Sequence, residues 1–201
     1  PLPAADAMVG SLVGPVRELF KKVQNAPGER EALAALNEFK ILTAMRRGPF
    51  GAPAINYQLE QALNVSGHWY PGRPLLITRN DYAVRLFNGD LGVAWPASDG
   101  NGMAVYFISP EGELREIAPG RLPEHETAFA LTIHKSQGSE FDRVLVVLPK
   151  QATPVLTREL VYTGITRAKN EVTLMAPPEI LGSAIEAKTT RASGLRDTLW
   201  N

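Results

Sequence analysis

The run Arg143-Val144-Leu145-Val146-Val147-Leu148 decides the fold, because after its first residue it is apolar and largely β-branched. This is the pattern of a strand buried on both faces of a parallel sheet. Three more short runs predict strands, at residues 39–43, 129–133 and 171–176, and three amphipathic stretches predict helices, at residues 54–63, 157–166 and 178–187. Strands that alternate with helices predict an α/β fold with a parallel sheet.

Two regions depart from this alternation. Apolar residues at three- and four-residue spacing predict a helix over residues 7–24, which Pro15 either kinks or divides in two. Between residues 89 and 126, short alternating segments separated by Pro, Gly, Asn and Asp predict hairpins. The predicted organisation is a helical lead-in at 1–37, a domain formed by 38–88 and 127–201, and a β-rich insertion at 89–126.

Composition narrows the function classes. The 201 residues suit one or two small domains, and the absence of cysteine excludes disulfides and cysteine metal sites. The chain has 21 Lys and Arg residues and 21 Asp and Glu residues, so its formal net charge is zero. A domain that coats DNA would normally be basic, so the net charge does not predict one. The three histidines are scattered, which predicts no metal site. No apolar run is long enough for a membrane helix, and we expect a cytoplasmic protein.

One polar string stands out, Thr132-Ile133-His134-Lys135-Ser136-Gln137-Gly138-Ser139-Glu140-Phe141-Asp142. It lies at a predicted strand-to-helix junction, where short polar side chains and backbone N–H groups suit a phosphodiester because a helix N-terminus carries partial positive charge. Thr132, His134, Lys135 and Ser136 are therefore candidate donors to DNA phosphates. Alternatively, His134 and Lys135 are solvated residues at the start of a helix.

Two arginine-containing strings follow predicted elements. Leu42-Thr43-Ala44-Met45-Arg46-Arg47-Gly48-Pro49-Phe50-Gly51 ends a strand, where α/β folds place ligand groups. Tyr162-Thr163-Gly164-Ile165-Thr166-Arg167-Ala168-Lys169 ends a helix. A guanidinium can spread charge over several phosphoryl oxygens. The alternatives are solvated arginines before a turn at Arg46, and a helix-end arginine favoured by the dipole at Arg167.

Two loops could have either a local structural role or a binding role. Asn88-Gly89-Asp90 is a turn signal, since Asn and Gly tolerate left-handed backbone, so a hairpin accounts for it without any ligand. The exposed-looking pair Trp69-Tyr70 could stack on bases or a partner, or could pack locally.

Together and in this order, residues 132–142 and 162–169 resemble the last two motifs of superfamily 1 DNA helicases. The elements Gly48-Pro49-Phe50-Gly51 and Phe87-Asn88-Gly89-Asp90 are more similar to the RecD branch than to the UvrD and Rep branch. The resemblance covers residues 36–195. It implies the second RecA-like motor domain of such a helicase, with a small β-barrel-like insertion.

The resemblance also implies roles for single residues. Arg46 and Arg167 would be catalytic and reach the γ-phosphate of ATP, with Arg167 as an arginine finger, while Gly138 and Glu140 would lie at the nucleotide. The implied DNA contacts are Thr132, His134, Lys135, Ser136, Asn80, Asn88 and Gly89. The implied activity is a 5′–3′ helicase subunit of exodeoxyribonuclease V, acting on single-stranded DNA with RecB and RecC in double-strand break repair and recombination.

The other half of a helicase engine is not found in the sequence. The chain has no G-x-x-x-x-G-K-[ST] phosphate loop and no Asp-Glu pair after an apolar strand. It also starts at Pro1 rather than Met, and we expect a C-terminal fragment. ATP would bind between this domain and an N-terminal motor domain, which would hold the Mg²⁺ ligands. Such a fragment alone would have negligible ATPase activity. Alternatives are a stand-alone RecD-like helicase and a motor-derived domain that serves protein assembly.

Overall fold

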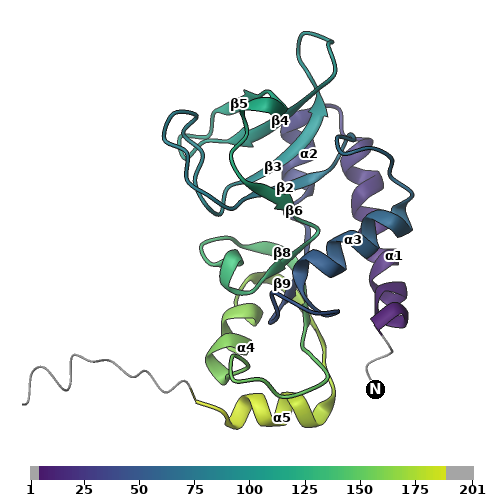
Figure 1. Cartoon of the computed structure of the whole chain (residues 1–201), viewed down its shortest axis with the longest axis vertical. Coiled ribbons are helices and arrows are strands. Elements are labelled where there is room, and N and C mark those ends of the chain that lie inside the picture. The colour runs from purple at the N-terminus through teal and green to yellow at the C-terminus, as the bar shows by residue number, and fades with distance from the viewer. Residues whose placement is uncertain (1–4, 189–201) are drawn as a thin grey trace, which may run out of the picture.

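The computed structural model describes residues 5–188 and contains two sheets, one above the other along the long axis (Figure 1). Residues 1–4 and the end of the predicted motor domain, 189–201, lie outside the described residues. Within the described part, no helix is long and apolar enough to cross a membrane. The helices are α1 Ala5–Gln24, α2 Glu29–Ala35, α3 Ala52–Leu63, α4 Arg158–Ile165 and α5 Pro178–Glu186, with 3-10 turns η1 Pro119–Arg121 and η2 His134–Ser136.

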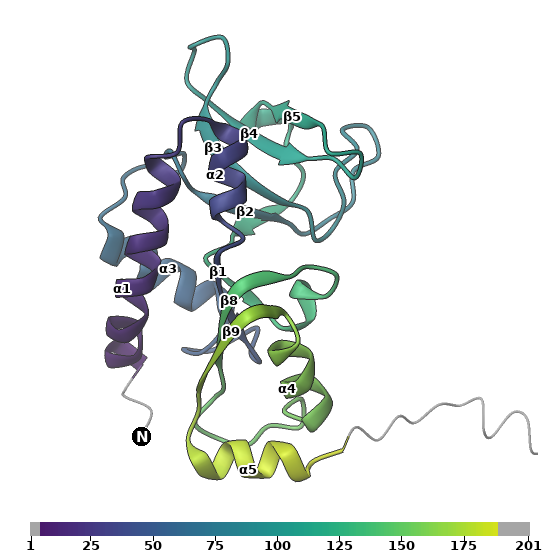
Figure 2. The ribbon, with the colours of Figure 1, turned by 180° about the vertical axis from the view of Figure 1, so that it is seen from behind.

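The lower sheet is parallel and has the strand order β7-β1-β8-β9. Its strands are β1 Phe39–Thr43, β7 Ala130–Thr132, β8 Phe141–Val147 and β9 Ala168–Met175. Along β8, Val144 and Val146 join the core under α4 and α5, while Leu145 and Val147 join the core under α1 and α3. Helices thus cover both faces, as the apolar run predicted, and the α/β class is confirmed (Figure 2).

Helix α1 is one continuous helix although Pro15 lies inside it, so the predicted division into two helices is wrong. Leu12, Val16, Leu19 and Val23 form a buried stripe along it. An interior proline costs about 3 kcal/mol. Burying each large aliphatic side chain gains roughly 1.5–3 kcal/mol, so the stripe outweighs the proline.

The upper sheet is antiparallel, with the order β5-β4-β3-β2-β6, and it extends beyond the predicted 89–126 at both ends. Its strands are β2 Pro74–Ile77, β3 Leu91–Pro96, β4 Met103–Ile108, β5 Leu114–Ile117 and β6 His125–Thr127. β2 lies in the segment 38–88 that the sequence assigns to the domain with the parallel sheet, but it pairs antiparallel with β3 and β6. All of β2 is buried, and a short, wholly apolar run carries no periodicity that would reveal its partners.

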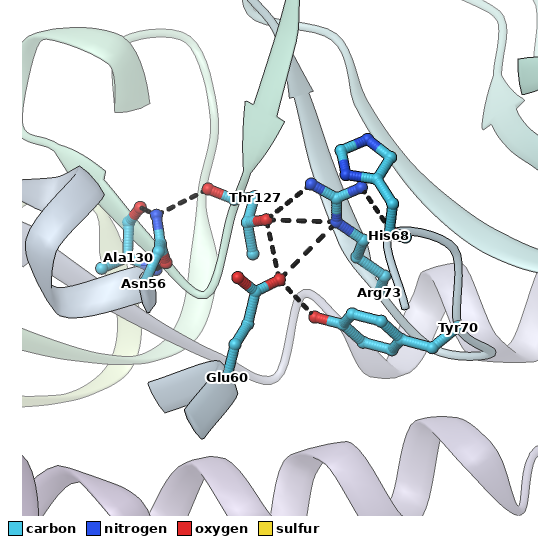
Figure 3. Close-up of polar contacts among 7 residues, drawn as sticks. All are labelled: Asn56, Glu60, His68, Tyr70, Arg73, Thr127 and Ala130. Atoms are coloured by element: carbon cyan, nitrogen blue, oxygen red, sulfur yellow. Dashed lines mark hydrogen bonds and ion pairs between the residues drawn. The ribbon is translucent and has the colours of Figure 1, made fainter. Parts of the chain in front are cut away.

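The chain passes from the upper to the lower sheet through residues 127–130, which we call the crossing segment. β6 ends at Thr127 and β7 begins at Ala130, so only two residues separate the strands. This short stretch of backbone can form few ladder hydrogen bonds between the two sheets. The side-chain amide of Asn56 donates to the carbonyl oxygens of Thr127, at 2.6 Å, and Ala130, at 2.9 Å. Its own oxygen accepts from the Ala130 N–H at 2.7 Å (Figure 3). The buried Lys40 ammonium donates to the Ala128 carbonyl at 3.0 Å.

A second layer of polar contacts surrounds the Thr127 side chain (Figure 3). The Arg73 guanidinium donates to the Thr127 hydroxyl at 2.9 and 3.1 Å, and that hydroxyl donates to the Glu60 carboxylate at 3.0 Å. Tyr70 donates to the same carboxylate at 2.7 Å and packs edge-on against Phe20. Buried polar groups with such partners are satisfied, and the cluster fixes α3 to the crossing segment.

The Trp69-Tyr70 loop therefore packs locally, which was the second of the two roles considered for it. Tyr70 is buried in the core, and Trp69 is partly buried in a cluster with the rings of His68 and His125. The Arg73 guanidinium lies 5.3 Å from the Trp69 ring centroid.

Asn56→Ala should destabilise the fold by about 3 kcal/mol, because it leaves buried backbone groups of Thr127 and Ala130 without partners. Urea unfolding would measure this loss. Gln61→Ala, an exposed amide on the same helix, should change stability by less than about 0.5 kcal/mol. Equal effects of the two substitutions would show that the Asn56 contacts do not hold the crossing segment.

Lys40 links stability to pH. Burial lowers its pKa from 10.5 to about 7, because the charged ammonium loses its hydration. Below pH 7 the lysine is protonated in both states, and burying its charge opposes folding. Above pH 7 the folded state releases the proton while the unfolded chain keeps it up to its own pKa near 10.5, so stability rises with pH in this window.

The unfolding free energy of the native chain, minus that of Lys40→Met, should therefore rise by about 1 kcal/mol per unit between pH ~7 and ~9. Urea unfolding at several pH values measures this difference. The exposed Lys150→Met serves as the control, and its difference from the native chain should stay flat. A flat difference for Lys40→Met as well would mean that Lys40 stays charged in the folded state.

Candidate functional site

The carboxyl ends of β1 and β7 meet at one edge of the parallel sheet, and a groove of about 540 Å³ lies there. We call it the strand-end groove. Its lining residues are Ala44, Met45, Arg46, Arg47, Thr132, His134, Lys135 and Val155. Arg46 and Arg47 are exposed on the turn that follows β1, and His134 is exposed after β7. The sheet thus brings basic side chains from two separate motifs to the edge where α/β folds bind ligands.

Two of the predicted DNA contacts differ from expectation in this groove. Ser136 is fully buried, and its hydroxyl donates to the Ile133 carbonyl at 2.8 Å, so it presents no donor to a ligand. Thr132 is also buried, and its hydroxyl accepts from the Lys135 N–H at 3.3 Å. The predicted strand-to-helix junction is only a three-residue 3-10 turn, too short for a helix-dipole argument. Both hydroxyls shape the turn instead of facing solvent.

The strand-end groove continues toward α4. His134 and Val155 also line a second hollow, of about 390 Å³, together with Gln137, Thr157 and Thr163. Val155 is half exposed where the two hollows share their lining. The combined lining mixes polar and basic side chains with apolar ones, which are Ala44, Met45, Pro154, Val155 and Leu160.

Lys135 has a partner that sequence reasoning missed. Its ammonium lies 2.7 Å from the Glu126 carboxylate, which belongs to β6 of the upper sheet. Both side chains are partly exposed. Nothing in the local sequence marks Glu126, because the contact depends on how the crossing segment brings β6 beside η2.

Arg167 and Glu140 lie at the opposite edge of the parallel sheet. The Arg167 carbonyl accepts from the Phe141 N–H at 2.8 Å, at the start of β8. Its guanidinium donates to the carbonyls of Ser139 and Thr163, each at 3.2 Å, and Glu140 beside it is exposed. Gly138, with φ +85°, forms the turn that leads into this edge. Three of the four residues predicted to face the nucleotide are therefore brought together: Gly138, Glu140 and Arg167.

Arg46 is not among them. It follows the carboxyl end of β1, whereas Arg167 precedes the amino end of β9. The length of β8 from Phe141 to Val147 separates these edges by about 20 Å at the usual strand rise. Arg46 thus lies with the predicted DNA contacts His134 and Lys135, and the structure does not bring it to the edge that holds Arg167.

The predicted contacts Asn80, Asn88 and Gly89 lie on the loop after β2. The Asn88 N–H donates to the Asn80 side-chain oxygen at 2.8 Å, and the Gly89 N–H donates to the Ile77 carbonyl at 3.0 Å. These groups close the turn on itself, as the hairpin alternative predicted. Among residues 5–188 no group of three or more His, Asp or Glu side chains is arranged to hold a metal ion.

Comparisons with known proteins agree with the motifs. Residues 127–175 match the model of the UvrD-like helicase C-terminal domain. RecBCD enzyme subunit RecD of Mycolicibacterium smegmatis is 44% identical over 177 residues, which cover 85% of this chain and 31% of that protein. The ATP-dependent RecD2 DNA helicase of Deinococcus radiodurans is 37% identical over 139 residues, covering 65% of this chain and 19% of that protein.

The chain therefore spans less than a third of the length of these curated relatives. Among solved structures, the Pif1 helicase from Candida albicans aligns with a TM-score of 0.49 at 14% identity, over 85% of this chain and 56% of that one.

Proposed function

We propose that this chain is the second motor domain of an ATP-dependent DNA helicase. Most of the chain matches a RecD subunit, and residues 127–175 match the UvrD-like helicase C-terminal domain. The observation that carries the proposal is the 44% identity to a RecD subunit over 85% of the chain. The parent protein would move 5′ to 3′ on single-stranded DNA. It would act with RecB and RecC in exodeoxyribonuclease V, in double-strand break repair and recombination.

The strand-end groove is our candidate for the DNA track. Binding to phosphates requires positive charge and no reading of bases. In this groove the contacts would come from Arg46, Arg47, His134 and Lys135. We assign Arg46 to DNA in place of the nucleotide role first inferred for it, because it lies at the same edge as His134 and Lys135. Ser136 takes no part in this assignment because it is buried.

The opposite edge would face ATP. Arg167 would supply a guanidinium to the γ-phosphate, and Glu140 would lie near the sugar. Carbonyls of Ser139 and Thr163 already orient the Arg167 side chain, which limits the reorganisation needed to reach a phosphate. Mg²⁺, which neutralises phosphate charge when bound, would be held by the N-terminal motor domain of the parent protein. This chain alone would then have negligible ATPase activity.

A stand-alone RecD-like helicase is the second candidate. The 37% identity to a protein named as the ATP-dependent RecD2 DNA helicase favours it, although that match covers less of the chain than the match to RecD. The two candidates assign the same roles to both edges of the sheet and differ only in the need for RecB and RecC. Co-purification of the full-length parent with RecB and RecC would separate them.

Arg46→Ala should weaken binding of the chain to single-stranded oligothymidine and reduce the salt slope of log K by about one, as expected for the loss of a phosphate contact. Fluorescence anisotropy over a salt series measures both. Arg121→Ala removes an exposed arginine of the same charge from η1 and should leave the slope unchanged. An unchanged slope for Arg46→Ala would place the DNA elsewhere.

Arg167→Ala, made in the full-length parent, should lower DNA-stimulated ATP hydrolysis by at least about 10³-fold, as for other arginine fingers. Binding of oligothymidine should persist, since Arg167 lies at the other edge. Arg167→Lys, which keeps the charge without the guanidinium fork, should restore only a small part of the rate. If hydrolysis continued at the native rate, Arg167 would be a helix-end residue held by its backbone contacts.

A further inference from the structure

We propose that Glu126 competes with DNA phosphates for the Lys135 ammonium, so that this contact of the track is exchangeable during each cycle of binding and release. The inference rests on the proposed DNA role of the strand-end groove. It concerns a residue of the upper sheet, outside both helicase-like motifs, and gives that sheet a direct effect on DNA affinity.

The geometry supports a specific pair. The Glu126 carboxylate accepts from the Lys135 ammonium at 2.7 Å, a distance typical of a charge-assisted hydrogen bond. The Lys135 N–H is at the same time held by the Thr132 hydroxyl, which fixes the start of the side chain at the groove. In the absence of DNA, the positive charge of Lys135 is therefore already matched, while Arg46 and Arg47 remain exposed in the same groove.

The exposure of the pair decides whether a phosphate can displace the carboxylate. The side chains of Lys135 and Glu126 are 22% and 30% exposed, so water and salt screen their attraction. Solvent-exposed ion pairs contribute little to stability, and both members of this pair keep contact with solvent. A phosphodiester can thus replace Glu126 at Lys135 at low cost, and the nearby carboxylate can reclaim the ammonium when the DNA leaves.

A fold-holding role for the ion pair is less consistent with the structure. The upper and lower sheets are already joined at the crossing segment by the buried contacts of Asn56 and Lys40. A partly exposed pair adds little to these contacts. The carboxylate therefore has more influence on the charge of the groove than on the packing of the sheets.

The test measures oligothymidine binding by fluorescence anisotropy at about 50 to 200 mM salt, with Glu126→Gln in the full 201-residue chain. We expect binding to tighten about two- to fivefold at low salt, the range set by a partly exposed ion pair. The salt slope should steepen by about one, since Lys135 would gain a lasting phosphate contact.

Two further variants separate this mechanism from general electrostatics. Glu124→Gln removes the same charge two positions away and releases Arg79, its partner at 3.8 Å, so it shows whether removing any nearby carboxylate suffices. Glu126→Gln in a Lys135→Ala background shows whether the gain needs Lys135. We expect a smaller gain with Glu124→Gln and none in the Lys135→Ala background, with all variants matching the native chain in thermal unfolding.

An equal gain with Glu124→Gln, or a gain that persists without Lys135, would overturn the inference in favour of a general charge effect. Weaker binding by Glu126→Gln would overturn it in favour of a structural ion pair. If the native chain binds and Glu126→Gln leaves affinity unchanged, only this inference fails. If neither the native chain nor any variant binds oligothymidine, the proposed DNA groove fails with it.

Discussion

The fold depends on satisfying the backbone of the crossing segment. At residues 127–130 the chain leaves an antiparallel sheet and enters a parallel one, so neither ladder can supply all the hydrogen bonds. Side chains take this role: Asn56 closes on Thr127 and Ala130 from α3, and Lys40 reaches the Ala128 carbonyl from β1. An unpaired buried peptide group costs about as much as a lost hydrogen bond, which explains why polar residues occupy this part of the core.

Each of these side chains brings its own desolvation cost, and the structure shows different ways of meeting it. The buried Arg73 guanidinium is surrounded by the Thr127 hydroxyl, the His68 carbonyl and the nearby Glu60 carboxylate, which offset the loss of its hydration. Among residues 5–188 Lys40 has no carboxylate partner, only the Ala128 carbonyl and the face of Phe141, and burial lowers its pKa. Burial of a cation is therefore compensated by charge pairing in one case and by proton release in the other.

The sequence was most informative where periodicity and burial agree. The apolar run of β8 predicted a strand covered on both faces, and the ends of the helices after it were close to those observed. It was least informative where the answer depends on contacts distant along the chain. The pairing of β2 with β6 and the partnership of Glu126 with Lys135 depend on the path of the crossing segment, and the burial of Ser136 has no signal in the local sequence. The placement of Arg46 at the carboxyl edge of the parallel sheet could also be seen only from the sheet topology.

The connection from Thr132 to Phe141 has a mechanical consequence. It starts at the carboxyl edge of the parallel sheet, passes β1, and ends at the amino edge, where β8 begins. The distance to be covered is about 22 Å, from the strand rise and two strand spacings. Residues 133–140 could extend to only about 30 Å, and the turn η2 takes up part of that length. The connection therefore spans about three-quarters of its extended length, so its two ends can separate by only a few ångströms more unless η2 unwinds.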